Sequence, residues 1–212
     1  MLKIQLDNIS KKFDKKWIFK NLNYQFETNQ HCVIKGHNGS GKSTLLQLLA
    51  TSITPTKGIT SYQLNGKEIP VEEMYKYLSI CTPYLELIEE FTLSEMIAFH
   101  SKFKKMLGNK SVEEYIDLLN LNEHTNTYLS KFSSGMKQRV KLGLAILSDT
   151  PLLLLDEPSS NLDAKAINWY QNLINDYQKD RLIIVCSNEQ KQEYEFCEKE
   201  LDVEKFKNHI NL

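Results

Sequence analysis

One glycine-rich stretch constrains the fold of this chain more than any other feature of its sequence. It matches the pattern G-x-x-x-x-G-K-[ST] and reads Gly36-His37-Asn38-Gly39-Ser40-Gly41-Lys42-Ser43-Thr44. A short apolar run, residues 32–34, precedes it, and residues 42–51 continue with the leucine spacing of a helix that has one buried face. A strand, a tight loop and a helix are therefore predicted here, because the glycines allow the backbone to turn sharply after the strand.

The same stretch is predicted to bind phosphate groups. Its turning backbone points N–H groups inward, and the start of the following helix adds about half a positive charge. The Lys42 ammonium would reach the β- and γ-phosphates of a nucleoside triphosphate, and the Ser43 hydroxyl is a candidate ligand of Mg²⁺. The residues predicted to bind the nucleotide here are Gly36, Asn38, Gly39, Ser40, Gly41, Lys42, Ser43 and Thr44.

A second element of the predicted site follows an apolar strand. Residues 152–155 are leucines, and Asp156 and Glu157 come directly after them. Ligands of open parallel sheets bind at the carboxyl ends of the strands, so we expect Asp156 to hold Mg²⁺ through water and Glu157 to activate an attacking water as a general base. Two adjacent carboxylates also form plain solvated turns, but the phosphate-binding loop favours the catalytic interpretation.

The order of apolar segments indicates an α/β fold. Strands are predicted at residues 3–9, 17–26, 32–34, 59–64, 77–81, 152–155, 182–186 and 201–203. Helices are predicted at residues 42–51, 135–147 and 164–178, after the capping boxes Thr92/Glu95 and Ser111/Glu114, and again after residue 186. Continuously apolar strands that alternate with helices predict a parallel sheet covered on both faces, into which the helical middle of the chain is inserted.

A third motif lies shortly before the leucine strand and reads Phe132-Ser133-Ser134-Gly135-Met136-Lys137-Gln138-Arg139-Val140. Ser133, Ser134 and Gly135 open a helix, so hydroxyls, N–H groups and the helix dipole converge on a second anion site, although a serine pair is also an ordinary N-cap. With this motif the chain resembles the ATP-binding cassette (ABC) ATPases, whose signature is LSGGQ. The resemblance extends from about residue 2 to residue 199.

The resemblance implies a P-loop NTPase of the ABC type, with a mostly parallel core sheet, an antiparallel β-subdomain and an inserted helical subdomain. One domain would fill residues 1–212. The ATP-binding core with its β-subdomain would occupy 1–82 and 151–212, and the helical subdomain 83–150.

The resemblance also implies partners and a base-stacking residue. Two copies, or this chain and a related cassette, would dimerise head to tail, with each Mg-ATP held between one phosphate loop and the other chain's Ser133, Ser134 and Gly135. The D-loop position at the dimer contact is occupied by Ser160-Asn161-Leu162-Asp163. Phe13 matches the position of the aromatic residue that stacks on adenine better than Trp17 does, although an exposed aromatic near a hairpin is as often a packing residue.

Three positions depart from the family pattern. The family's glutamine after the strand at 78–81 is absent from Thr82-Pro83-Tyr84-Leu85-Glu86, and its histidine after the strand at 182–186 is replaced within Ser187-Asn188. Asn188 donates a hydrogen bond but cannot become a cation, and Met136, in the glutamine position of the signature, has no donor. Because Lys42, Ser43, Asp156 and Glu157 remain, we predict real but slow hydrolysis, with Glu157, Lys42 and Asn188 as catalytic residues.

Composition predicts a soluble chain that could act on a membrane only through a partner. Among 212 residues, 26 basic and 27 acidic side chains give a formal net charge of −1, so no nucleic-acid partner is expected. No apolar run approaches the roughly 20 residues that span a bilayer, and the N-terminus has no signal-peptide core. The 4 cysteines form no CxxC pair, which is typical of a reducing compartment. These features predict a cytoplasmic protein, and the resemblance implies that it is peripheral on the inner face of the cell membrane.

The predicted function is that of an ATP-hydrolysing ABC transporter subunit that drives separate transmembrane permease subunits, with export as the expected direction. Residues 82–100 would form the groove that receives a membrane subunit's coupling helix, or else only an apolar helix face in the core. The alternatives are an ABC ATPase that works without a membrane and an ATP-gated clamp that barely hydrolyses ATP. The single phosphate loop and the lack of heptads between residues 43 and 133 disfavour the first, and Glu157 disfavours the second.

Overall fold

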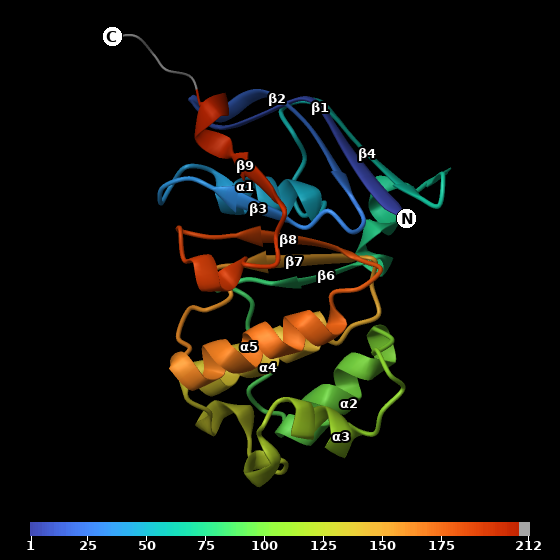
Figure 1. The fold of residues 1–212 in the computed structure, drawn as a ribbon, viewed down its shortest axis with the longest axis vertical. Helices are drawn as coiled ribbons and strands as arrows, with labels where there is room; N and C mark the ends of the chain where they lie inside the picture. The colour runs from blue at the N-terminus through green and yellow to red at the C-terminus, as the bar shows by residue number, and fades with distance from the viewer. Residues whose placement is uncertain (208–212) are drawn as a thin grey trace.

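Two stacked sheets organise the computed structural model, which describes residues 1–207 (Figure 1). The antiparallel sheet has the order β2-β1-β4-β5, with strands β1 (Leu2–Phe13), β2 (Lys16–Glu27), β4 (Lys57–Leu64) and β5 (Lys67–Glu68). The parallel sheet has the order β6-β7-β8-β3-β9, with strands β6 (Leu78–Cys81), β7 (Leu152–Asp156), β8 (Leu182–Cys186), β3 (Cys32–Lys35) and β9 (Lys199–Asp202). The predicted α/β fold with a parallel core sheet and an antiparallel β part is confirmed.

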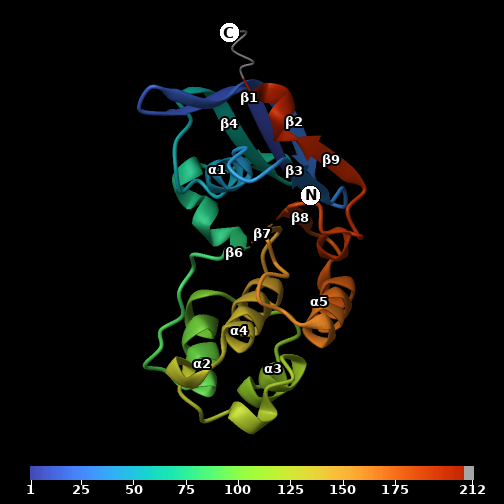
Figure 2. The same cartoon turned by 90° about the vertical axis from the view of Figure 1, so that its left-hand side faces the viewer.

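The α-helices form layers on the two faces of the parallel sheet. Helix α1 (Lys42–Leu49) lies between the two sheets, and α4 (Ser134–Ile146) and α5 (Ala164–Tyr177) cover the opposite face (Figures 1 and 2). Helices α2 (Leu93–Phe103) and α3 (Val112–Leu118) lie beyond them, at the end of the molecule away from the antiparallel sheet. The 3₁₀ turns are η1 (Val71–Lys76), η2 (Asn122–His124), η3 (Leu129–Lys131), η4 (Lys191–Glu193) and η5 (Val203–Phe206). None of the helices within residues 1–207 is long and apolar enough to cross a membrane.

Strand β7 shows why the parallel sheet is covered on both faces. Leu152 and Leu154 pack into the core with α1 and the antiparallel sheet, whereas Leu153 and Leu155 pack into a second core with the helices on the opposite face. Every residue of the strand is buried. Because neighbouring residues of a strand point to opposite faces, an uninterrupted apolar run is what a doubly covered strand requires.

Both predicted capping boxes are confirmed. The Thr92 hydroxyl accepts a hydrogen bond from the Glu95 N–H at 3.3 Å, and the Glu95 carboxylate accepts one from the Thr92 N–H at 2.8 Å. Ser111 and Glu114 repeat this exchange at 3.2 and 2.6 Å at the start of α3. These bonds satisfy N–H groups that have no partner within a helix, which fixes where α2 and α3 begin.

The C-terminal part of the chain differs from the expectation. The helix predicted after residue 186 is wrong, since the 3₁₀ turns η4 and η5 stand in this region instead. The predicted edge strand at 201–203 is present as β9, beside β3 at the edge of the sheet, but it ends at Asp202. In residues 187–200, buried Glu193 and Tyr194 stand next to each other between exposed Lys191 and Glu195, so no continuous apolar face supports a longer helix.

Candidate active site

A polar pocket of about 470 Å³ lies at the carboxyl end of β3, where the glycine-rich loop turns into α1. It brings that loop together with Glu157, which directly follows β7. The residues that line the pocket are Ile18, Asn38, Gly39, Ser40, Gly41, Lys42, Ser43, Thr44, Tyr84 and Glu157. The two motifs that the sequence places far apart therefore meet at the carboxyl ends of β3 and β7, two parallel strands of one sheet with β8 between them, where such sheets bind ligands.

The backbone of the loop explains its glycines. Gly41 is the N-cap of α1 and has a φ of +107°, and a Cβ there would lie 2.5 Å from a methyl carbon of Ile18. Gly36 has a φ of +144°, and its Cβ would lie 2.5 Å from the Ser40 hydroxyl oxygen. Within the described chain, α1 has neither a side-chain cap nor an acidic residue in its first turn. Its N-terminal N–H groups are therefore left for an anionic ligand.

Lys42 and Glu157, which both line the pocket, are joined by hydrogen bonds through Asn188. The Lys42 ammonium donates to the Asn188 Oδ1 at 2.5 Å and to the Gly36 carbonyl at 2.7 Å. The Asn188 Nδ2 in turn donates to the Glu157 Oε1 at 2.5 Å. An asparagine suits this place because its amide offers one acceptor to the cation and one donor to the carboxylate.

Asp156 and Ser43 are the candidate metal ligands. Asp156 is 3% exposed, and its Oδ1 has no hydrogen-bond partner within residues 1–207. Burial raises the pKa of the Asp156 carboxyl, while the neighbouring Ser43 hydroxyl lowers it. A carboxylate oxygen and a hydroxyl are the kind of hard ligands that Mg²⁺ prefers, alongside phosphate oxygens and water. The buried, unpartnered oxygen beside Ser43 therefore fits a Mg²⁺ ion carried on a nucleotide.

The backbone at Glu157 is held in an unusual conformation. Its φ is +45°, in the left-handed region that costs a non-glycine residue on the order of 1 kcal/mol. The Glu157 N–H donates to the Cys186 carbonyl at 2.9 Å, and the Ser160 N–H donates back to the Glu157 carbonyl at 3.0 Å. From the other side, the Gln138 side chain of α4 donates to the Pro158 carbonyl at 3.1 Å. The turn that follows β7 is thus fixed by contacts from separate elements.

The signature segment, Ser133-Ser134-Gly135, lies outside the phosphate pocket. Ser133 is the N-cap of α4, and its hydroxyl accepts a hydrogen bond from the Met136 N–H at 3.2 Å. A Cβ on Gly135 would lie 2.8 Å from the Asn161 carbonyl oxygen, so the signature segment contacts the D-loop position. Both serines are exposed, and none of the three residues is among those that line the pocket in the described part of the chain.

Two residues that the sequence did not single out line the pocket, and the aromatic candidates do not. Ile18 contacts the loop at Gly41, and Tyr84 reaches the pocket from the segment after β6. Phe13 is 47% exposed, with the Lys11 ammonium 4.9 Å from its ring, and Trp17 lies under Lys20 at 4.7 Å. Neither is among the lining residues found within 1–207, so base stacking by Phe13 stays a prediction.

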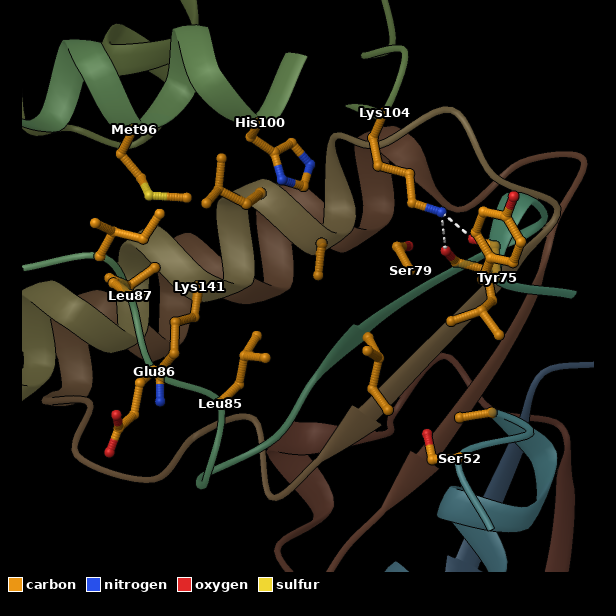
Figure 3. Close-up of a pocket in the computed structure, with 16 residues that line it drawn as sticks. Ser52, Tyr75, Ser79, Leu85, Glu86, Leu87, Met96, His100, Lys104 and Lys141 are labelled. Atoms are coloured by element: carbon orange, nitrogen blue, oxygen red, sulfur yellow. Dashed lines mark hydrogen bonds between the residues drawn. The ribbon is translucent and has the colours of Figure 1, made fainter. Parts of the chain in front are cut away.

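A second cavity, of about 480 Å³, lies between α2, α4 and the segment after β6 (Figure 3). Its lining is mostly apolar and includes three basic side chains, His100, Lys104 and Lys141. The Lys104 ammonium donates to the Leu78 carbonyl at 2.9 Å and to the Tyr75 carbonyl. His100 Nε2 lies 2.9 Å from the Ser148 hydroxyl oxygen. Burial lowers the pKa of both Lys104 and His100, because it disfavours their charged forms.

Residues 82–100 divide between this cavity and the core. Leu93 and Ile97 of α2 are buried in the core that the helices share with the parallel sheet. Leu85 and Ile88, which precede the helix, are 43% and 37% exposed and line the cavity. The two sequence-based alternatives, a groove and a core-facing helix, thus apply to different parts of the same stretch.

Comparisons with known proteins agree with this geometry. The family profile described as ABC transporter matches residues 19–160. The uncharacterized ABC transporter ATP-binding protein YybJ of Bacillus subtilis is 28% identical over 202 residues, which cover 94% of this chain and 92% of that protein. The human phospholipid-transporting ATPase ABCA3 is 27% identical, over 80% of this chain but 10% of its own length.

Solved structures of ATP-binding cassettes have a similar fold. The cassette MJ0796, in a dimeric post-hydrolysis state bound to ADP and Pi, aligns with a TM-score of 0.78 at 22% identity, over 94% of this chain and 93% of that one. A chain from Pyrococcus furiosus described as a putative ABC transporter ATP-binding protein aligns with a TM-score of 0.78 at 20% identity, over 97% and 99% of the two chains. The predicted cassette fold is confirmed.

Proposed function

This chain belongs to the ABC transporter family, and from that membership we propose that it is the ATP-hydrolysing subunit that drives separate transmembrane subunits. The observation that carries the proposal is the pocket in which Lys42 and Ser43 of the phosphate loop meet Glu157, with buried Asp156 beside Ser43. A cation, a hydroxyl that can bind Mg²⁺ and a candidate base thus line one pocket, and a second candidate ligand of Mg²⁺ lies next to it.

The proposed reaction is attack of water on the γ-phosphorus of ATP. As the water oxygen bonds to phosphorus, the bond to the bridging oxygen of ADP breaks, and Glu157 accepts the proton that the water loses. Lys42 stabilises the negative charge on the phosphate oxygens. Ser43 and Asp156 would hold Mg²⁺, which neutralises further phosphate charge when it is bound.

Slow turnover is part of the proposal. Lys42 already donates a hydrogen bond to Asn188, and Glu157 already accepts one from Asn188. The triphosphate therefore has to displace Asn188 from Lys42, and the attacking water has to displace it from Glu157. The uncharged amide also compensates less charge on the γ-phosphate than a protonated histidine would. The same contacts favour a second candidate function, an ATP-gated clamp with little hydrolysis, and the turnover of Mg-ATP distinguishes the two.

We propose a head-to-tail dimer around two Mg-ATP, formed with a second copy or a related cassette. The support is the exposed N-terminus of α4: Ser133 and Ser134 offer hydroxyls and helical N–H groups but lie outside the pocket of their own chain. In such a dimer, the N-terminus of α4 would bind the phosphates of the nucleotide that the other chain holds.

The mostly apolar cavity beside α2 supports a membrane partner. We propose that it receives a coupling helix of a transmembrane subunit, which would place this chain on the inner face of the cell membrane. Relatives such as YybJ are named as ABC transporter proteins, which fits this role. Export is the direction we propose, on the family resemblance alone.

Replacement of the base tests the proposed function. Glu157→Gln should bind Mg-ATP as the parent does but hydrolyse it at least about 100-fold more slowly, because the amide cannot accept the proton. It should therefore accumulate as an ATP-bound dimer, seen by light scattering during size-exclusion chromatography. Lys42→Ala is the matched control, expected to lose both binding and dimerisation. Hydrolysis by Glu157→Gln at the parent rate would exclude the assignment of Glu157 as the base.

A further inference from the structure

A buried carboxylate that has no part in the reaction described above lies behind the Glu157 turn. Glu193, at the end of η4, is 2% exposed. Among residues 1–207 no lysine or arginine forms an ion pair with it, and its Oε2 has no hydrogen-bond partner. A carboxylate buried in this way destabilises the fold unless other contacts compensate. The remaining contacts of the Glu193 side chain are those of its Oε1.

The Oε1 of Glu193 holds the turn that carries the base. It accepts hydrogen bonds from the Ser159 backbone N–H at 3.0 Å and from the Ser159 hydroxyl at 2.6 Å. Ser159 is two residues after Glu157 in the chain, inside the turn. These two hydrogen bonds attach the turn to Glu193.

Glu193 is itself fixed to the body of the molecule. Its backbone carbonyl accepts a hydrogen bond at 2.8 Å from the hydroxyl of Tyr170, a fully buried residue of α5. Glu193 follows Asn188 by one short segment, so the group that contacts the Glu157 side chain and the group that holds its turn come from the same stretch after β8.

The turn needs such support because of its backbone. Glu157 is held at a φ of +45°, and a strained residue keeps its conformation only where the surroundings over-determine it. Gln138 holds Pro158 from α4, and Glu193 holds Ser159 from η4. Without the second of these contacts the turn could relax and move the Glu157 carboxylate away from the attacking water.

We infer that Glu193 is a positioning residue for hydrolysis: through Ser159 it keeps the Glu157 carboxylate where it can take the proton from water. The inference rests on the proposed function and assigns to η4 a role in the chemical step. Because Glu193 does not line the phosphate pocket, its effect falls on turnover and not on nucleotide binding.

The test compares Glu193→Ala and Glu193→Gln in the full chain. Steady-state Mg-ATP hydrolysis gives kcat and KM, and a fluorescent ATP analogue gives the affinity and the number of binding-competent sites. We expect Glu193→Ala to lower kcat by about 10- to 100-fold with KM changed less than about 3-fold, as for a displaced catalytic group. Glu193→Gln keeps an oxygen that can accept both Ser159 bonds, and its kcat should return to within about 3-fold of the parent.

Glu198→Ala is the matched control. It removes an exposed carboxylate five residues after Glu193, and its kcat and KM should equal those of the parent. Equal kcat values for Glu193→Ala and Glu198→Ala would overturn the inference. So would a rise in KM of more than about 10-fold, or a glutamine variant as slow as the alanine one, because a general collapse of the site produces these results. A parent protein that binds ATP without turnover would instead contradict the proposed function, which is a distinguishable result.

Discussion

Asn188 decides how charge is distributed in the phosphate pocket. Its amide joins a cation and a carboxylate that would otherwise approach each other directly, and it does so without adding a charge. A histidine in its place could donate to the γ-phosphate as a cation, since its ordinary pKa is about 6.5. In the structure, Asn188 links Lys42 and Glu157 without adding a charge.

Asn188→His should raise kcat for Mg-ATP by about 10-fold, which corresponds to one additional charge-assisted hydrogen bond in the transition state. The measurement is steady-state phosphate release at saturating Mg-ATP between pH 6 and 8. Asn172→His, at an exposed position of α5, is the control and should leave the rate unchanged. An Asn188→His rate equal to that of the parent would show that Asn188 does not limit turnover.

Asp156 gives a prediction about stability and pH. Burial raises its pKa above 3.8 in the folded state, so between 3.8 and the raised value the folded protein binds the proton more tightly than the unfolded one. The contribution of this group to stability is therefore largest at low pH and is lost as pH rises through the folded-state pKa.

Asp156→Asn should accordingly increase the free energy of unfolding at pH 7 when Mg²⁺ and nucleotide are left out, because the amide has no charge to bury. The gain should shrink as the pH is lowered toward the raised pKa. The same variant should lose the extra thermal stability that Mg-ATP gives the parent. Urea titrations at several pH values measure the first effect, with exposed Asp176→Asn as the control; an Asp156→Asn variant less stable than the parent at pH 7 would refute it.

At the scale of elements, helix starts were predictable because their causes are local. A capping box needs only a hydroxyl and a carboxylate three residues apart, and both boxes form where the sequence indicates. The phosphate loop and the leucine strand are equally local signals. Contacts such as Lys42–Asn188, Ile18–Gly41 and Ser159–Glu193 join residues far apart in the chain, so no local spacing could have indicated them. The helix after β8 was wrongly predicted for another reason: residues 187–200 have no continuous apolar face.

Thr92→Ala should reduce the free energy of unfolding by about 1 kcal/mol, since the Glu95 N–H and the start of α2 lose their cap. Ser101→Ala in the same helix is the control; its exposed hydroxyl bonds only to the Ala98 carbonyl one turn earlier, so the expected change is within about 0.5 kcal/mol. Urea unfolding followed by circular dichroism compares the two. Equal stabilities would mean that the capping box does not stabilise α2 in the folded protein.

At the scale of the whole molecule, one buried cation joins the helical layers to the parallel sheet. Arg181, directly before β8, is 3% exposed and donates to the Ile146 carbonyl at the end of α4 at 2.7 Å. It also donates to the Ser148 carbonyl at 3.1 Å and to the Thr150 hydroxyl at 3.0 Å. Burial lowers the pKa of its guanidinium to about 10, yet at neutral pH it remains charged against the negative end of the α4 dipole.

Arg181→Ala should therefore cost about 3 kcal/mol of unfolding free energy, because it leaves buried carbonyls without donors and opens a cavity. Lys179→Ala, two residues earlier and exposed, should change it by less than about 0.5 kcal/mol. Chemical denaturation measures both. A small effect of Arg181→Ala would show that water or a neighbouring side chain satisfies the carbonyls instead.

The short segment after β6 has a thermodynamic consequence. Tyr84 lines the phosphate pocket, and the next residue, Leu85, lines the apolar cavity beside α2. A ligand that shifts this segment from one side changes the shape of the other cavity. Linkage then makes the effect reciprocal: if ATP strengthens the binding of a partner helix tenfold, that helix strengthens the binding of ATP tenfold, a coupling of about 1.4 kcal/mol. A partner helix coupled in this way would be an allosteric effector of nucleotide affinity. It would change the binding of ATP before any ATP is hydrolysed.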